Sequence, residues 1–407
     1  MRIGLFTDQF YPQISGVVTS VKMLYEALEA MGHECFIFTA TDQEGHEDDP
    51  EIKYKKVINF KGIHYPFKAC KEYYFYMRPK KFIKIIESYN LDIIHLNTEF
   101  AISKVARLAS KKLHIPLVHT LHTAWINYIG TLFPKTDPIL HPFWIKVMQV
   151  LFTKPSYKAA TLEILPTKKM IPDLKDYGIN GNDFEIMPTG IELRRFFKEN
   201  FTDEEIGELK DKLNLKNKFI FEYVGRTSRE KSCDVLLSAY AKAFKNNDDV
   251  RFLLVGGGPV LDDLKAQVKE LGIEDKVVFT GLVAWNVVPI YYHLGNVFLN
   301  ASKTETQGLT YVEALAAELP NLVQNDLCID GVIVEGFNGY LFDDESELVE
   351  KLKYIYGHQD ELKEVKENTL PSSLKYSKEE FAKHALAIYK KAIEMYFNEP
   401  KNKKYKK

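Results

Sequence analysis

Short apolar runs alternate with amphipathic segments along both halves of this chain. In the first half, the apolar runs predict four strands, at residues 3–6, 35–38, 92–96 and 116–120. Helices are predicted at 16–31 and 100–112, and Gly32 is suited to end the first of them. Strands that alternate with helices are typical of a parallel sheet covered on both faces.

The second half repeats the same order of elements after a charge-dense stretch between Ile191 and Lys218. Four further strands are predicted, at 219–224, 251–255, 277–280 and 297–300. Three helices are predicted in this half, at 235–244, 259–271 and 310–317. The pattern therefore predicts an α/β protein with two doubly wound domains, at residues 1–195 and 196–377.

A last helix is predicted at 378–397, and no strand follows it. We expect this helix to return to the N-terminal domain, with residues 398–407 as a basic tail. Ligands of doubly wound sheets bind at the carboxyl ends of the strands, so two such domains are expected to face a central ligand-binding cleft.

The composition excludes several classes of function for this chain of 407 residues. Its net charge of −2 argues against a protein that binds nucleic acid through bulk positive charge. The four cysteines, Cys35, Cys70, Cys233 and Cys328, lie far apart and lack the spacing of a zinc site. No apolar run reaches the roughly 18 residues that span a bilayer. We expect a cytoplasmic protein with no metal in its catalytic step.

The charge is unevenly distributed, and residues 51–158 hold 18 Lys and Arg against six Asp and Glu. Aromatic residues are interleaved with these cations, and Lys80, Lys81 and Lys84 fall on a predicted amphipathic helix. One interpretation is docking on anionic lipid headgroups; the other is an ordinary solvated helix over a core. A second apolar stretch at 142–152 and the lysine-rich segment 401–407 favour the membrane interpretation further.

The most informative chemistry lies at 301–320, after an apolar strand. Glu305 falls in the loop, Gly308 at the predicted helix start, and Glu313 about one turn inside the helix. Amide groups at a helix start can hold phosphate oxygens, and carboxylates can accept hydrogen bonds from sugar hydroxyls. A helix-capping carboxylate and a solvated glutamate would explain the same pattern.

Two further loops follow strands of the second half. Arg226 and Lys231 come after Gly225, and a cationic loop at a strand end is suited to grip a diphosphate, although it would also suit an exposed surface. The run Gly256–Gly258 opens a helix, where glycine permits close approach of a ligand or simply forms a tight turn. In this run Gly257 is the candidate for the ligand site.

In the first half, Gly16 begins a helix after the first strand and leaves space for a phosphate or sugar. His122 follows another strand, where its ring could hydrogen-bond a substrate hydroxyl. A single histidine is also commonly structural.

At these positions the sequence resembles the retaining family 4 glycosyltransferases of the two-domain GT-B fold over essentially its whole length. Its most specific motif is the pair Glu305 and Glu313, separated by seven residues. Within the family it is most similar to the bacterial diacylglycerol glucosyltransferases. This likeness rests on the segments 94–100, 118–123, 165–170 and 188–191.

The resemblance implies roles for ten residues. Arg226 and Lys231 would hold the donor diphosphate, Glu313 the ribose and Glu305 the transferred sugar. His122, Glu305, Arg226 and Lys231 would form the catalytic set. The remaining donor contacts would come from Gly16, Gly257, Gln307, Gly308 and Leu309.

The resemblance also implies the reaction, which is transfer of glucose from UDP-glucose to the 3-hydroxyl of diacylglycerol with retention, on the inner face of the membrane. UDP-sugar, diacylglycerol and an anionic membrane surface would be the partners, without cofactor or nucleic acid. Another acceptor, another hexose donor or an inactive donor-binding scaffold are the alternatives. Ser15, Glu318 and Asn321 depart from the family pattern without removing a chemical group.

Overall fold

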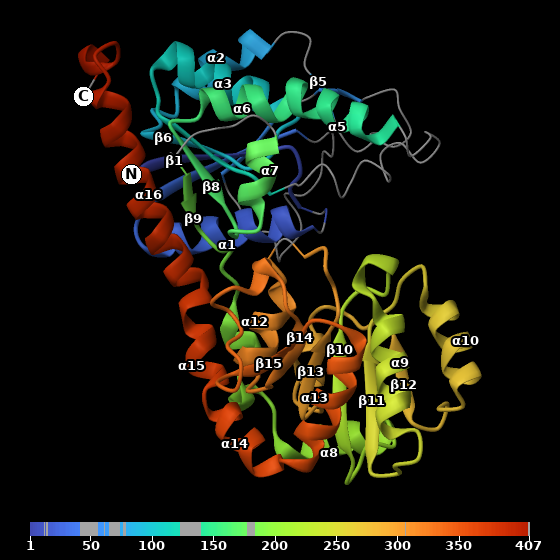
Figure 1. Ribbon diagram of the computed structural model, residues 1–407. Coiled ribbons are helices and arrows are strands. Elements are labelled where there is room, and N and C mark those ends of the chain that lie inside the picture. Colours follow the sequence, from blue (N-terminus) through green and yellow to red (C-terminus); the bar gives the residue numbers. More distant parts are fainter. Residues whose placement is uncertain are drawn as a thin grey trace. The chain divides into compact units, whose positions relative to one another are not determined.

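The chain divides into two compact units, which the computed structural model describes for residues 1–11, 13, 15–40, 56–60, 62–64, 74–75, 79–122, 140–176, 184–305 and 307–405. Unit 1 comprises Met1–Ile191 together with Lys378–Lys407, and unit 2 comprises Glu192–Ser377 (Figure 1). The break lies four residues before the boundary expected from the sequence. Tyr54, Phe67 and Tyr73, aromatic residues of the basic stretch, lie outside the described residues.

Unit 1 is built on a seven-stranded sheet in which all neighbouring strands are parallel. In spatial order the strands are β3 (Val57–Asn59), β2 (Glu34–Thr39), β1 (Arg2–Thr7), β6 (Ile93–Leu96), β7 (Leu117–Thr120), β8 (Leu162–Leu165) and β9 (Phe184–Ile186). A separate antiparallel pair is formed by β4 (Ile63–His64) and β5 (Tyr74–Phe75). The four strands predicted in this half are β1, β2, β6 and β7.

Helices cover both faces of this sheet because its strands are apolar on both sides. Alternate residues of β1 show this: Ile3 and Leu5 pack with α1 (Gly16–Ala30) and α16 (Lys378–Asn398), whereas Phe6 packs in the core that contains α3 (Ala101–Leu113). The other helical segments among the described residues of unit 1 are η2 (Pro79–Phe82), α2 (Ile83–Glu87), α5 (His141–Met148), the π-helical η4 (Gln149–Thr153), α6 (Lys154–Ala159), α7 (Met170–Asp176) and η10 (Lys403–Tyr405).

The C-terminal helix α16 belongs to the core of unit 1, although unit 2 precedes it in the chain. Its buried side chains recur every three or four residues, as expected for one helical face: Phe381, Ala382, Ala385, Ile388, Tyr389 and Ala392. No helix in the described part of the chain combines the length and apolar character needed to cross a bilayer.

Unit 2 is built on a six-stranded parallel sheet. In spatial order the strands are β12 (Val277–Gly281), β11 (Val250–Val255), β10 (Phe219–Val224), β13 (Val297–Asn300), β14 (Asn321–Gln324) and β15 (Gly339–Phe342). Its α-helices are α8 (Asp203–Lys212), α9 (Cys233–Phe244), α10 (Leu261–Leu271), α11 (Val288–Tyr291), α12 (Leu309–Ala316), α13 (Glu345–Gly357), α14 (Gln359–Glu367) and α15 (Thr369–Ser373). Shorter 3₁₀ turns are η5 (Leu193–Phe196), η6 (Lys198–Asn200), η7 (Arg229–Lys231), η8 (Leu327–Ile329) and η9 (Leu374–Tyr376).

The sequence did not predict strands β8, β14 and β15 or helices α13 and α14. The three strands have four residues each, and a short buried run cannot be assigned to a strand or a helix from its periodicity. Pairing with neighbouring strands in the sheet is what makes these segments extended.

Candidate functional site

The start of α12 in unit 2 has the backbone geometry that the sequence pattern suggested. Gly308 immediately precedes the helix with φ +67°, in the left-handed region that favours glycine. A Cβ there would lie 2.1 Å from Cε2 of Tyr311, so a side chain could not be accommodated without movement. Gln307 is buried and Leu309 is partly buried. The first amides of α12 lack partners within the helix, and such amides can bind an anion.

An ion pair joins Lys231 to Glu305, two residues that the sequence singled out from separate motifs. Lys231 follows β10 and Glu305 follows β13, and these strands are neighbours in the sheet. The side chains are 24 % and 15 % exposed, so both remain accessible to a ligand. The two opposite charges therefore neutralise each other.

Glu313 is held by a tyrosine that the sequence gave no reason to select. Its Oε2 accepts a hydrogen bond of 2.7 Å from the hydroxyl of Tyr292, which is fully buried. Burial raises the pKa of Glu313, while this hydrogen bond and the charge of Arg195 act in the opposite direction. Tyr292 thus fixes the orientation of the carboxyl group. Nothing in the local sequence distinguishes it from a core tyrosine.

The glycine run after β11 packs against the loop that carries Arg226. A Cβ on Gly256 would lie 1.9 Å from the carbonyl oxygen of Gly225, and one on Gly258 would lie 2.1 Å from that of Thr227. The carbonyl of Gly257 accepts a hydrogen bond of 3.1 Å from the amide of Thr227. These contacts give the glycines a packing role, one of the two interpretations that the sequence left open.

Arg226 itself is exposed. Its carbonyl oxygen accepts a hydrogen bond of 2.9 Å from the hydroxyl of Tyr223, which fixes the backbone of this loop. The side chain makes no ion pair with any residue that the structure describes, so the guanidinium is available to a ligand.

Unit 1 contains the other two predicted site residues, Gly16 and His122. Gly16 is exposed at the first position of α1, and a Cβ added there would meet no atom within 4 Å. Ser15 caps this helix, because its Oγ accepts a hydrogen bond of 3.3 Å from the amide of Val18. The N-terminus of α1 therefore has open space in front of it.

His122 lies two residues beyond β7 and is partly buried. Burial and, secondarily, the positive charge of His119 lower its pKa to about 3, so its ring is neutral at physiological pH. Its Nε2 is inaccessible to solvent and has no hydrogen-bond partner among the described residues. A buried ring nitrogen without a hydrogen-bond partner is energetically costly.

Two of the departures from the family pattern, Glu318 and Asn321, lie at the end of α12 and on β14. Glu318 follows α12 with φ +58°, so a glutamate adopts the left-handed geometry in which glycine is more usual. Asn321 is fully buried, and its Nδ2 donates to the carbonyl of Leu319 at 3.2 Å. Neither residue alters the Lys231–Glu305 ion pair.

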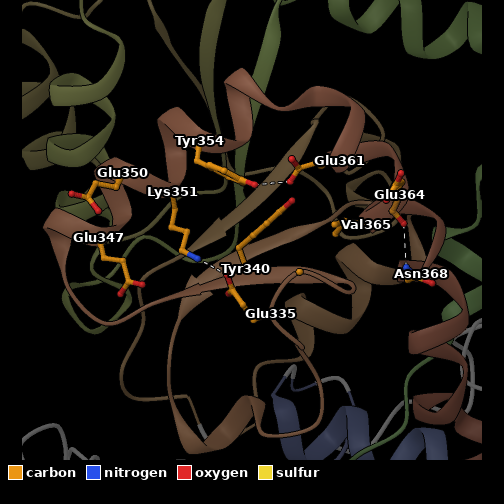
Figure 2. Close-up of a pocket in the computed structure, with 11 residues that line it drawn as sticks. Glu335, Tyr340, Glu347, Glu350, Lys351, Tyr354, Glu361, Glu364, Val365 and Asn368 are labelled. Carbon is orange, nitrogen blue, oxygen red and sulfur yellow. Dashed lines mark hydrogen bonds and ion pairs between the residues drawn. The ribbon is translucent and has the colours of Figure 1, made fainter.

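A cavity of about 730 Å³ opens elsewhere in unit 2, beside α13 and α14 (Figure 2). Figure 2 shows Lys351 directed towards Glu335 and Tyr354 towards Glu361 across its wall. The first pair is an ion pair, and the second is a hydrogen bond of 2.6 Å. None of the predicted site residues lines this cavity.

Unit 1 carries a basic groove of about 750 Å³ between η2 and α3. Its lining residues include five cations and no carboxylate: Pro79, Lys80, Lys81, Lys104, Arg107, Leu108 and Lys111. Phe82, Ile83 and Ile86 of the same segment are buried in the core. The segment is therefore amphipathic, with its aromatic side inward and its lysines outward.

A ridge of exposed apolar side chains runs along α5 and η4. Leu140, Phe143, Val150 and Leu151 are between 48 % and 60 % exposed. Lys146 and Lys154 lie on the same helical run, which Figure 1 shows continuing from α5 into α6. An apolar ridge flanked by lysines is typical of helices that lie at a membrane surface.

Comparison with known proteins gives two family matches that together cover most of the chain. The model described as "Glycosyl transferases group 1" matches residues 205–370, and that described as "Glycosyltransferase Family 4" matches residues 14–195. The alpha-monoglucosyldiacylglycerol synthase of Acholeplasma laidlawii is 36 % identical over 398 residues, covering 96 % of both chains. The enzyme of the same name from Streptococcus pneumoniae is 34 % identical over 400 residues, covering 97 % of this chain and 86 % of its own.

Solved structures share the fold at low sequence identity. Anabaena Alr3699/HepE in complex with UDP and glucose aligns with a TM-score of 0.72 and 17 % identity, over 96 % of this chain and all of that one. A glycosyltransferase from Rickettsia africae aligns with a TM-score of 0.74 at the same identity, over 96 % of this chain and 98 % of its own.

Proposed function

This chain belongs to the family 4 glycosyltransferases, and we propose that it transfers glucose from UDP-glucose to the 3-hydroxyl of 1,2-diacylglycerol at a membrane surface. The observation that carries the proposal is the identity of 36 % with a monoglucosyldiacylglycerol synthase over almost the entire length of both chains. The fold is GT-B, and the protein is a nucleotide-sugar-dependent hexosyltransferase.

Unit 2 is the proposed donor-binding unit. Arg226 and Lys231 would bind the diphosphate of UDP-glucose, and the amides of Gln307, Gly308 and Leu309 would add neutral hydrogen-bond donors. Binding of the diphosphate would draw Lys231 away from Glu305 and leave that carboxylate to accept hydrogen bonds from glucose. This exchange is supported by the Lys231–Glu305 ion pair, whose partners both remain partly exposed.

The ribose would bind Glu313, whose carboxyl group Tyr292 already orients. In unit 1, Gly16, beside which the described residues leave open space, and His122 are the residues proposed to contact the donor sugar. A Cβ on Gly257 would lie 2.9 Å from Cγ of Leu282, so Gly257 packs closely against that side chain. This glycine lies beside the loop that carries Arg226.

The transfer would proceed with retention of configuration at C1 of glucose. The bond from C1 to the diphosphate oxygen breaks while a bond from C1 to the acceptor oxygen forms on the same face of the sugar. The hydroxyl proton of diacylglycerol passes to a phosphate oxygen of the leaving UDP. The protein would supply positive charge to the diphosphate through Arg226 and Lys231, so no protein nucleophile is required.

Unit 1 is the proposed acceptor and membrane-docking unit. The basic groove beside η2 supports an anionic surface as its partner, because lysines attract negatively charged headgroups. The apolar ridge on α5 and η4 supports shallow insertion at the inner face of the cell membrane.

The test is incubation of the purified protein with labelled UDP-glucose and 1,2-diacylglycerol in mixed micelles containing an anionic lipid. We expect a monoglucosyl lipid with an α-anomeric proton signal in NMR spectra. Parallel reactions replace the donor with UDP-galactose and the acceptor with a glycolipid that already bears one sugar. Transfer only to the second acceptor, or only from UDP-galactose, would contradict the proposed substrates.

A further inference from the structure

The cavity beside α13 and α14 in unit 2 has a strongly acidic wall. Its volume of about 730 Å³ is in the range of small-molecule sites. A smaller hollow of about 270 Å³ shares part of this wall and adds Asp343 to it. One lysine, Lys351, lines the larger cavity, against five carboxylates: Glu335, Glu347, Glu350, Glu361 and Glu364. The wall therefore favours a cationic ligand.

Two of these carboxylates have no counter-charge. Glu350 on α13 and Glu364 on α14 are exposed, and neither carboxylate forms a hydrogen bond or ion pair with any residue that the structure describes. Figure 2 shows them at opposite sides of the cavity, with Glu335 and Glu361 between them. Uncompensated negative charge thus lies on both sides of the same hollow.

Tyr340 on β15 provides an independent indication of a ligand. The residue is only 5 % exposed and lines the cavity, yet its hydroxyl forms no hydrogen bond within the described part of the chain. Native proteins rarely leave a polar group in such a position without a partner, because the loss of hydration is costly. In Figure 2 its side chain points into the space between Lys351 and Val365. A ligand in that space can supply the missing hydrogen bond.

The phenol of Tyr340 is neutral at physiological pH, because burial and then the negative charge of Glu361 raise its pKa to about 12. Its oxygen can accept a hydrogen bond from an ammonium group. Lys351 shows that an ammonium group fits this wall: its Nζ is ion-paired with Glu335 and lies 6.0 Å from the centre of the Tyr340 ring. An ammonium group near an aromatic face is stabilised by the ring electrons.

The spacing of the carboxylates argues against a single metal ion as the ligand. Calcium and magnesium need several oxygen ligands around one point. Among the residues that the structure describes, no three histidine, cysteine or acidic side chains lie close enough together to hold a metal ion. A flexible molecule with several positive charges can instead reach carboxylates that lie apart.

We propose that this cavity binds a linear polyamine, an aliphatic chain that carries two or more ammonium groups. The terminal ammonium groups pair with Glu350 and Glu364, and a nitrogen between them donates a hydrogen bond to the Tyr340 hydroxyl. The methylene groups pack against Val365 and the ring of Tyr354. Such amines are protonated at pH 7. No residue of the proposed donor site lines the cavity, so binding here is independent of the proposed reaction.

The test is calorimetry on the full-length protein at low ionic strength, with spermidine as the probe. We expect saturable binding, because the ammonium groups match separate carboxylates. A parallel titration adds spermidine to protein that already contains Mg²⁺ at the same concentration of positive charge. Little change in the spermidine affinity is expected. Complete loss of binding under that condition would show that diffuse negative charge attracts any cation, and would overturn the inference.

The double variant Glu350→Gln/Glu364→Gln should weaken spermidine binding about tenfold, since two partly exposed ion pairs are lost. The matched control is Glu270→Gln/Glu274→Gln, which makes the same change in charge at exposed positions of unit 2 outside the cavity. The control should bind spermidine as the wild type does. Equal weakening in both double variants would contradict a specific site.

Tyr340→Phe keeps the ring and removes only the hydroxyl. It should weaken spermidine binding several-fold through the lost hydrogen bond, while the unfolding temperature stays unchanged because this hydroxyl has no partner in the described chain. Wild-type affinity in this variant would overturn the proposed contact. Binding of an oligolysine peptide without binding of spermidine would also overturn the inference, because the partner would then be a basic protein segment.

Discussion

Lys231 and Glu305 are 74 positions apart in the sequence, and the sheet of unit 2 brings them together. The sequence identified both residues by their places after predicted strands, but it contained no indication that they form an ion pair. The contact pairs two charges that would each be costly to bury alone.

Replacing Lys231 with Met should weaken binding of UDP-glucose by about tenfold, because one charge-assisted hydrogen bond to the diphosphate is lost. Arg229→Met is the matched control, since Arg229 is exposed on the same short turn η7 and carries the same charge. Dissociation constants measured by calorimetry with UDP-glucose provide the comparison. Equal losses in the two variants would argue against a specific diphosphate contact.

Two histidines, His122 and His119, show which properties of a single residue could be predicted from the sequence and which could not. His122 could be selected because ligands of doubly wound sheets gather at strand ends. His119 could not be assigned a charge from the sequence, because Glu163 and Glu99 reach it from other segments. Tyr292, which orients Glu313, was missed for the same reason.

Among the elements, the segment η2–α2 was predicted from the sequence, but the groove that it lines depends on a neighbouring helix. The spacing of Phe82, Ile85 and Ile86 predicted an amphipathic helix. Phe82 and Ile86 are buried, whereas Ile85 is 43 % exposed. The groove exists only because α3 packs beside this segment and adds Lys104, Arg107 and Lys111. Neither segment alone would concentrate so much positive charge.

Reversal of charge in this groove should reduce binding to anionic vesicles by roughly a hundredfold or more, since each of three lysines near the surface contributes about 1 kcal/mol. The variant carries glutamate at three positions: Lys80, Lys81 and Lys111. The control makes the same change in net charge on exposed lysines of unit 2: Lys265, Lys269 and Lys353.

The measurement is flotation with vesicles that contain phosphatidylglycerol, at low and high salt. Binding of the wild type should fall as salt rises, because ions screen exposed charges. A similar loss of binding in both variants would show that net charge matters and that the groove itself does not.

At the scale of the whole molecule, the chain leaves unit 1 at Ile191 and returns to it at Lys378. The helix α16 then completes a core whose other members come from the first half of the sequence. Unit 2, by contrast, is continuous and has a core formed by its own residues. The two units therefore differ in how much they depend on the C-terminal segment.

Deletion of residues 378–407 should prevent unit 1 from folding, because Phe381, Ile388 and Tyr389 are removed from its core at about 3 kcal/mol each. Their sum is comparable with the entire stability of a typical domain. The fragment 192–377 should remain folded on its own. Circular dichroism and hydrogen exchange of the truncated chain and of the fragment test this, and a native unit 1 in the truncated chain would contradict it.

The family assignment and the two-domain α/β fold were predicted from the sequence and are confirmed by the comparisons. Both depend on features that are local in the chain, namely apolar periodicity and short motifs such as Glu305 and Glu313. The strands β14 and β15 escaped prediction because segments of four residues form strands only when a neighbouring strand pairs with them.

The sequence by itself determined which segments are apolar, where the glycine and charged loops fall, and which family the chain resembles. Tertiary structure alone decided the partners: Lys231 with Glu305, Tyr292 with Glu313, and His119 between two buried carboxyl groups. The reason is physical. Periodicity and turn chemistry act between neighbours in the chain, whereas burial and electrostatic interactions depend on distances in space that only the packed sheets and helices establish.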